Sequence, residues 1–430
     1  MSHENLKKIS ALLIFSIFIF STSESVFSAE AEKEEFDTLR VVLANKELPK
    51  KLLSGPNHKI VENVVSYNGF TNHFIIHTNF GRFKAIGNGM VPIRIHEINA
   101  IAELHKIKNS SAFVSGVKES GGTLLDTTKN LIIHPVDTVS GFPSGIYNIF
   151  ADTGEVIGQA VRGEATIAEA SKKGGEAIVG FSRNKREMAF ALGVNRYSNN
   201  KVLQEYMNSV SWAKTGGTAV IDFGKMAVSG PAGIAMTAVG SSRVLNRMMR
   251  DNSTPGLRRI NKEALGGLDI KETDINRFLA NQKLTPRHQT AITKSLVSLK
   301  RVKNPETLLN HFSLRTRSNN DANVNQVVAA MIAGYNQKKS PITEVRTFEN
   351  VALFRNKRGS IVVTYPVDNF YWTKRTAAKT IKVTNALPSG AKKELWISGK
   401  FSELASRNLK KLGWEVHAHS LLRLDVGNPY

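Results

Sequence analysis

The chain has 430 residues, no cysteine and a formal net charge of +22 at pH 7. This length is enough for two or three domains with their own cores, and the lack of cysteine excludes disulfides, thiol nucleophiles, iron–sulfur clusters and cysteine-ligated zinc. The excess of 58 basic over 36 acidic residues predicts a positive surface and anionic partners.

The first 31 residues have the pattern of a signal peptide. Lys7 and Lys8 precede an apolar segment at 9–20, and small residues with the sequence Ala-Glu-Ala at 29–31 follow. The apolar segment is shorter than the roughly 20 residues that span a membrane. We therefore expect cleavage and export, and a periplasmic or secreted protein that depends on its core for stability.

Residues 32–150 are predicted to form an N-terminal α+β region. Helical spacing of apolar residues predicts a helix within 31–53, whereas 70–78 and 82–86 have the pattern of strands joined by a tight turn at 79–81. After Pro92 the helical period returns at 95–104. These signals predict a small antiparallel sheet covered by a helix.

Two histidines, His73 and His77, would point to one face of the first of these strands. At roughly 3.3 Å per residue they lie about 13 Å apart, which is too far for one metal ion. We therefore predict ordinary surface histidines here and no metal site.

Residues 151–339 are predicted to form a mainly helical domain. Ser182 is the expected cap of a first helix that Gly193 ends, and a polar turn at 195–200 leads to a second helix. The Gly- and Ala-rich segment 216–240 contains charged residues and a Ser-Gly-Pro break, so we expect a buried helical hairpin rather than a membrane span. Further helix starts are predicted at Thr285, Asn304 and Asp321.

Basic residues on these helices are the candidate anion-binding groups. One set would form a pocket beside Tyr197, a second set recurs along one helix at spacings of four and three, and a third follows the turn at 254–256. The loop before the last helix adds a lysine near a helix start. The full set is Arg183, Lys185, Arg186, Arg243, Arg247, Arg250, Arg258, Arg259, Lys262 and Lys400.

Residues 340–430 are predicted to form a C-terminal α/β domain. Apolar residues alternate as in strands at 345–348, 351–354 and 360–365, with antiparallel pairing around 356–359. A strand at 394–398, a helix at 402–412 and a strand at 414–417 follow. The predicted fold class is thus α+β: a small N-terminal antiparallel sheet with helices, a mainly helical middle and a C-terminal α/β unit.

Four segments carry a resemblance to a known family. They read SRNKREMAFALGVNRYSNNKVLQEYMNSVSWAKTGG, RMMRDNSTPGLRRIN, DINRFLANQKLTPRHQTAITKSL and ISGKFSELASRNLKKLGWEVH. This pattern resembles an uncharacterised family of exported proteobacterial proteins with no assigned activity. The resemblance implies export and a single architecture over most of the chain, and it brings no functional residues.

These features lead to one expected function and two alternatives. We expect an exported basic protein that binds anionic polymers or surfaces of the cell envelope or environment, without enzymatic activity or cofactor, and with peripheral membrane contact as one form of that binding. Fingers, stacking platforms and RNP-type motifs are missing, so specific nucleic acid recognition is not expected. The alternatives are a hydrolase with an unrecognised site and a membrane-active protein that uses the hairpin 216–240.

Overall fold

The computed structural model describes residues 35–38, 41–67, 70–111, 113–115, 168–217, 219–226, 241–299, 301–427 and 429. The predicted signal peptide (1–31) lies outside these residues, as does 227–240 of the Gly- and Ala-rich segment. The α+β fold class is confirmed, whereas the domain boundaries at 150 and 339 stay predictions.

Six antiparallel strands form the N-terminal sheet. Their order is β1-β4-β5-β3-β2, and β6 also pairs with β5. The predicted hairpin is confirmed, because Thr78 pairs with Gly81 at the turn. The strands are β1 (Val41–Leu43), β2 (Ser54–Gly55), β3 (His58–Ile60), β4 (Asn63–Tyr67), β5 (Thr71–Thr78) and β6 (Gly81–Ile86).

The helix expected within 31–53 is wrong over most of the described part. β1 pairs with β4, and only the four-residue α1 (Ala44–Glu47) and the 3-10 turn η1 (Lys50–Leu52) are helical. Val41 and Val42 are β-branched and favour a strand when a partner strand is available. Pro49 then precedes η1 and cannot continue α1.

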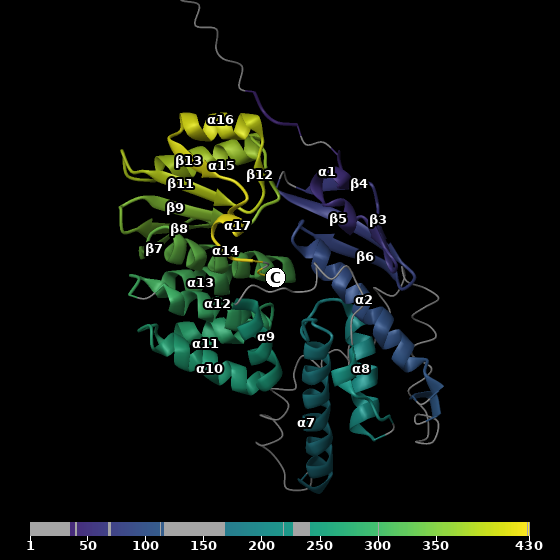
Figure 1. Cartoon of the computed structure of the whole chain (residues 1–430). Helices are drawn as coiled ribbons and strands as arrows, with labels where there is room; N and C mark the ends of the chain where they lie inside the picture. Colours follow the sequence, from purple (N-terminus) through teal and green to yellow (C-terminus); the bar gives the residue numbers. More distant parts are fainter. Residues whose placement is uncertain are drawn as a thin grey trace, which may run out of the picture. The chain divides into compact units, whose positions relative to one another are not determined.

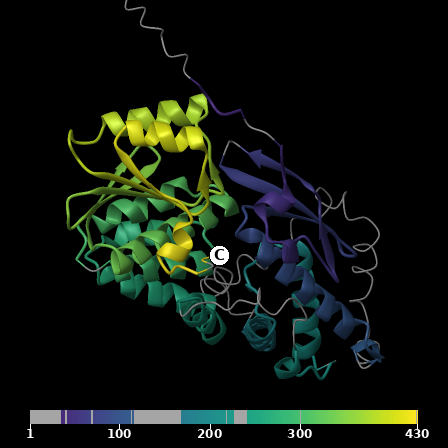
Figure 2. The ribbon, with the colours of Figure 1, turned by 45° about the horizontal axis from the view of Figure 1, so that its top comes forward.

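Three helices pack with this sheet in one hydrophobic core. They are α2 (Met90–Lys108), α7 (Ala168–Ala191) and α8 (Lys201–Thr215), and Figure 2 shows α2 running alongside the N-terminal strands. Phe74 from β5, Ile98 from α2 and Met188 from α7 are all buried in this core. The N-terminal sheet and the first two helices of the predicted helical domain are therefore packed together.

Two local expectations about these helices need correction. α7 begins at Ala168, so Ser182 lies inside the helix and does not cap it, although Gly193 follows its end with a positive φ of 67° as expected. The segment after α8 is not helical over 219–222, where the chain is irregular before the short η2 (Phe223–Lys225). Gly217, with a φ of 71°, stops α8. The first half of the expected helical hairpin is thus wrong.

The next six helices lie between the two sheets in sequence. Thr285 caps α12 in a capping box with His288, as the sequence predicts, whereas Asn304 makes no side-chain cap. Ser318, and not Asp321, caps α14 by accepting from the Asp321 backbone N–H. The helices are α9 (Ser241–Asp251), α10 (Thr254–Gly266), α11 (Glu272–Ala280), α12 (Pro286–Ser298), α13 (Pro305–Arg315) and α14 (Asn319–Lys338).

The C-terminal sheet is mixed, in the order β13-β11-β9-β8-β7. β9, β11 and β13 are parallel, and β7 and β8 are antiparallel to their neighbours, which confirms the predicted strands and the hairpin around 356–359. The elements are β7 (Ile342–Phe348), β8 (Val351–Asn356), β9 (Ile361–Tyr365), β10 (Asn369–Phe370), α15 (Lys374–Asn385), β11 (Lys393–Ile397), β12 (Lys400–Phe401), α16 (Glu403–Lys411), β13 (Trp414–His417) and α17 (Ser420–Arg423).

This sheet is covered on both faces. Figure 1 shows α15 and α16 on one face and α13 and α14 on the other. Phe354 and Val362 pack with the helical layer, whereas Val363 and Leu395 pack toward α15 and α16. Buried parallel strands with helices on both faces are typical of an α/β unit.

Asp368 connects this unit to the N-terminal sheet. Its carboxylate accepts hydrogen bonds of 2.8 Å from the backbone N–H groups of Asn72 and Asn88. Burial raises the pKa of Asp368 to about 6, and the two backbone bonds act in the opposite direction. Gly399 lies against the Asp368 backbone, so close that a Cβ there would be 1.9 Å from the carbonyl oxygen.

Replacing Gly399 with alanine is therefore predicted to destabilise the protein. The clash is with backbone, which cannot rotate away, so we expect a loss of about 2 kcal/mol or more in the free energy of unfolding, measured by urea denaturation. Gly266→Ala is the matched control, because that position ends a helix and has open space around it. Equal effects from the two variants would contradict a close backbone contact at Gly399.

Candidate anion-binding site

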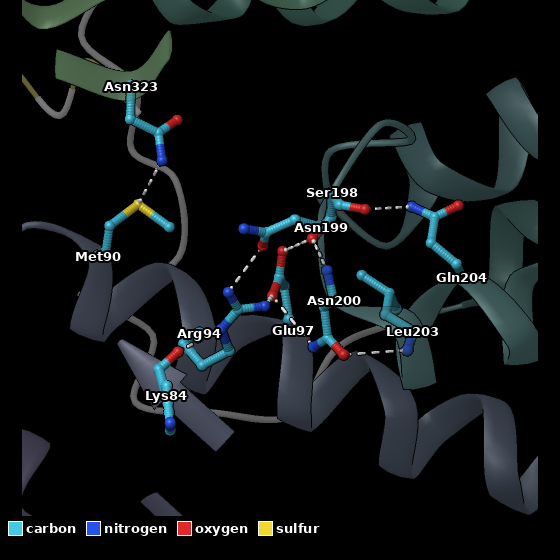
Figure 3. Close-up of polar contacts among 10 residues, drawn as sticks. All are labelled: Lys84, Met90, Arg94, Glu97, Ser198, Asn199, Asn200, Leu203, Gln204 and Asn323. Carbon is cyan, nitrogen blue, oxygen red and sulfur yellow. Dashed lines mark hydrogen bonds and ion pairs between the residues drawn. The ribbon is translucent and has the colours of Figure 1, made fainter. Parts of the chain in front are cut away.

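The loop at 194–200, between α7 and α8, is held by a buried carboxylate. Glu97 on α2 is only 3% exposed. It accepts hydrogen bonds from Arg94 Nη1 at 2.6 Å, from Asn200 Nδ2 at 3.1 Å and from the Ser198 hydroxyl (Figure 3). A carboxylate that is buried and ionised needs such a set of donors to offset its lost hydration.

The partners of Glu97 are themselves fixed. Arg94 donates to the Lys84 carbonyl at 3.2 Å and to Asn199 Oδ1 at 2.9 Å. Asn200 caps α8 by accepting from the Leu203 backbone N–H. Gln204 then donates to the carbonyls of Arg196 and Ser198 (Figure 3 shows the second bond). The conformation of the loop that carries Arg196 is therefore set by both its side chains and its backbone.

Four arginines surround a small cavity next to this loop, which we call the arginine pocket. Arg186 comes from α7, Arg196 from the loop, Arg250 from α9 and Arg287 from α12. The cavity has a volume of about 50 Å³. That is room for a few water molecules or one small oxyanion.

Hydrogen bonds to residues of α9 hold two of these arginines. Arg186 Nε donates to the Arg250 carbonyl at 3.0 Å, and Arg287 Nη1 donates to Asn246 Oδ1 at 2.8 Å. The Arg250 guanidinium lies 4.3 Å above the Phe190 ring and pairs with Asp251 at 2.6 Å. Arg250 thus has an acidic partner, whereas Arg186 and Arg287 donate to neutral oxygens.

Of the four arginines, Arg196 gives the strongest indication of an anion site. It is 8% exposed, and its Nε has no hydrogen-bond acceptor. The guanidinium stacks 4.3 Å from the Tyr197 ring, and Nη2 donates to the hydroxyls of Tyr197 and Thr254. A buried guanidinium with an unpaired N–H carries a free-energy cost of about 1–3 kcal/mol that an anionic acceptor would remove.

Burial lowers the pKa values of most basic groups here, whereas the hydrogen bond to Asp251 raises the pKa of Arg250. Burial, with a smaller effect of Arg186, lowers the pKa of Arg196 to about 9, and burial lowers the pKa of Arg287 to about 10. Lys185 donates to Asn208 at 2.7 Å, and burial followed by the charge of Arg196 lowers its pKa to about 8. The described residues that line the pocket include no carboxylate. The site thus concentrates positive charge, with Arg196 and Arg287 buried and Arg186 and Arg250 partly exposed.

The structure brings two of the ten sequence-predicted residues, Arg186 and Arg250, into this pocket. Arg183, Arg243, Arg247 and Arg259 are exposed on helices and do not line it. Arg258 donates to the Leu279 carbonyl at 2.6 Å, and two lysines pair with acids: Lys262 with Glu272 at 2.6 Å and Lys400 with Glu47 at 2.8 Å. Lys400 therefore neutralises a carboxylate and does not face an open anion site at the start of α16.

Arg196 and Arg287 were missed by the sequence reasoning. Arg196 lies in the predicted polar turn beside Tyr197, and Arg287 follows the Thr285-Pro286 helix start. The one signal in the sequence is that both residues lie next to a well-marked turn or helix cap, where the position of the backbone is fixed. Nothing in the sequence indicates that either side chain is buried.

Two other features bear on function: a membrane-spanning helix and a metal site. In the described part of the chain, no helix is both long and apolar enough to cross a membrane. The same residues include no group of three or more His, Cys, Asp or Glu side chains that could hold a metal ion. His73 and His77 lie on β5, where His73 is half-buried and His77 exposed.

No known protein family matches this chain, and no curated protein or solved structure is similar to it. The resemblance to an exported proteobacterial family therefore stays a prediction, and the site must be interpreted from its own geometry.

The Glu97 network generates a stability prediction. The substitution Glu97→Gln keeps the shape of the side chain but removes the negative charge that pairs with Arg94. It also places the amide N–H₂ group against the hydrogen-bond donors of Arg94, Ser198 and Asn200. We expect the free energy of unfolding to fall by about 3 kcal/mol, measured by urea denaturation at pH 7, as for other broken buried pairs.

The matched control for this variant is Glu103→Gln on the same helix. Glu103 pairs with Lys106 at the same i,i+3 spacing as Arg94 with Glu97, but Lys106 is 68% exposed. A surface pair contributes about 0–1 kcal/mol. If both variants change stability by the same small amount, water reaches the Glu97 network and its positioning role is lost.

Proposed function

We propose that this protein binds an anionic ligand in the arginine pocket and that it does so as an exported, non-enzymatic component of the cell envelope or its surroundings. The observation that carries the proposal is the convergence of Arg186, Arg196, Arg250 and Arg287 on one cavity. No described lining residue supplies a carboxylate, and Arg196 Nε lacks an acceptor. An oxyanion would provide both the missing charge and the missing acceptor.

The size and chemistry of the pocket favour a compact oxyanion group, such as a phosphate, sulfate or carboxylate. Guanidinium groups bind such groups through paired N–H donors. The low-dielectric surroundings that lower the arginine and lysine pKa values also strengthen the attraction to an anion. A surface that attracted anions only through net charge would not require buried arginines.

The exported location rests on the signal-peptide pattern at 1–31 and on the lack of cysteine. A net charge of +22 would also raise the rate at which polyanions meet the protein. Partners of this class include anionic polymers and the headgroups of anionic lipid surfaces.

Arg196→Gln is predicted to weaken the binding of inorganic phosphate about tenfold or more. The glutamine keeps a polar side chain but removes the charge and the guanidinium donors. Isothermal titration calorimetry at low salt measures the affinity, and thermal unfolding reports the stability. Stability should change little, because the charge that is removed has no acidic partner.

The control for Arg196→Gln is Arg259→Gln, an exposed position on α10 that does not line the pocket. It removes the same charge from the chain and should leave phosphate affinity within about twofold. Equal losses in the two variants would mean that diffuse net charge attracts the anion, and the proposed pocket would be wrong.

Phosphate affinity is also predicted to fall as the pH rises from 7 to 9. Lys185 has a pKa of about 8 in the folded protein, and its charge acts on Arg196. The anion favours the protonated ammonium, so the affinity is highest below this pKa and decreases as the proton is lost. Lys185→Met should reduce the loss of affinity between pH 7 and 8, and the loss near pH 9, where Arg196 titrates, should remain. An unchanged profile in this variant would contradict the role of Lys185.

A further inference from the structure

The arginine pocket is one end of a row of three adjoining cavities. It shares Gly193, Asn195 and Arg287 with a middle cavity of about 70 Å³. The middle cavity in turn shares Met90, Asn199 and other residues with a third cavity of about 450 Å³. The three cavities therefore adjoin one another along the loop at 194–200, and we call this row of cavities the groove.

The middle cavity presents more apolar than polar surface, and its charged lining residues are Glu97 and Arg287. Glu97 lines it, but its carboxylate is already bonded to Arg94, Ser198 and Asn200. His288 also lines it, and burial lowers the pKa of His288 to about 4, so the ring is neutral at pH 7. This section suits an uncharged part of a ligand.

The third cavity combines cations with amides. Its described lining has no acidic residue, and its volume lies within the range of ligand clefts, about 300–1,000 Å³. The cations are Arg82, Lys84, Arg94 and Lys201, of which Arg94 is paired with Glu97. The amides are Asn199, Asn200, Asn319, Asn320 and Asn323, of which Asn199, Asn200 and Asn323 are already bonded to Arg94, Glu97 and His288.

The amides matter because of what they recognise. An asparagine side chain both donates and accepts, which is the pairing that a hydroxyl group needs. Arg82 and Lys201 are exposed and line the third cavity but neither the middle cavity nor the arginine pocket. The groove therefore has positive charge at both ends and hydroxyl-binding groups in the wide end.

We infer that the ligand of the proposed anion site is an extended anionic glycan, which places one acidic group in the arginine pocket and further acidic groups and hydroxyls in the third cavity. This inference rests on the proposed function and adds the class of ligand. Two linked contacts raise affinity through a high effective concentration, by about 100-fold or more when the linker fits.

A single-stranded nucleic acid fits the groove less well. Such chains are bound largely by stacking of bases on exposed aromatic rings. In the third cavity the one aromatic residue among the described lining is Phe83, which is buried, and Tyr197 in the middle cavity is covered by Arg196. Hydrogen bonding to hydroxyls is the recognition chemistry that this lining offers.

The test is a length series of heparin-derived oligosaccharides, from disaccharide to octasaccharide, measured by calorimetry on the full chain. Affinity should rise by about 100-fold up to the length that joins the two ends, and then level off. The double variant Arg82→Gln with Lys201→Gln should lose most of this rise. Its affinity for inorganic phosphate should equal that of the unmodified protein, because neither residue lines the arginine pocket.

Two controls separate this groove from general charge. Arg259→Gln with Lys283→Gln removes two exposed cations elsewhere and should keep the length dependence. Asn320→Ala should weaken octasaccharide binding but leave the binding of linear polyphosphate, which has no internal hydroxyls, unchanged.

Each opposite result has a distinct meaning. Equal losses in the two double variants, or an affinity that does not depend on length, would overturn the extended groove and leave the arginine pocket standing. Polyphosphate or a single-stranded oligonucleotide that binds as tightly as the octasaccharide would overturn the glycan assignment. A protein that binds no inorganic phosphate would overturn the proposed function itself.

Discussion

The buried carboxylate of Glu97 is the interaction on which the arrangement of the candidate site depends. It joins α2 to the loop at 194–200 through Arg94, Ser198 and Asn200. Burying one charged group is costly unless its partners are complete, and here each donor to Glu97 comes from a residue that is itself anchored by further hydrogen bonds. This completeness fixes the loop, and the loop in turn fixes Arg196 beside the pocket.

The arginine pocket shows the opposite electrostatic condition. Glu97 has a paired cation and two neutral donors, whereas Arg196 is equally buried but meets only hydroxyls and a tyrosine ring. Uncompensated buried cations destabilise a fold. Proteins retain such groups where binding requires them, because the ligand completes the pairing. The contrast between the two neighbouring sites is consistent with a structural role for Glu97 and with the binding role that we propose for the arginines.

Polar contacts also decide how the C-terminal α/β unit joins the N-terminal sheet. Asp368 accepts from the backbone N–H groups of Asn72 in that sheet and of Asn88 in the turn after it, and Lys400 pairs with Glu47 on α1. A lysine that looks free for a ligand in the sequence is here part of a structural contact between residues 353 positions apart. Such distant pairing is the reason that a basic residue count overestimates the charge available for binding.

The sequence by itself determined the elements with strong local signals: the hairpin at 70–86, the helix cap at Thr285 and the strands and helix within 394–417. It also determined the positive charge and the absence of cysteine chemistry. It failed at 31–53, where a partner strand overrode the helical period, and at Ser182, where a longer helix passes through a residue that often caps. Only the tertiary structure decided which basic residues meet. Arg186, Arg196, Arg250 and Arg287 are up to 101 residues apart (186 to 287), and burial and convergence depend on packing between helices, which local periodicity does not encode.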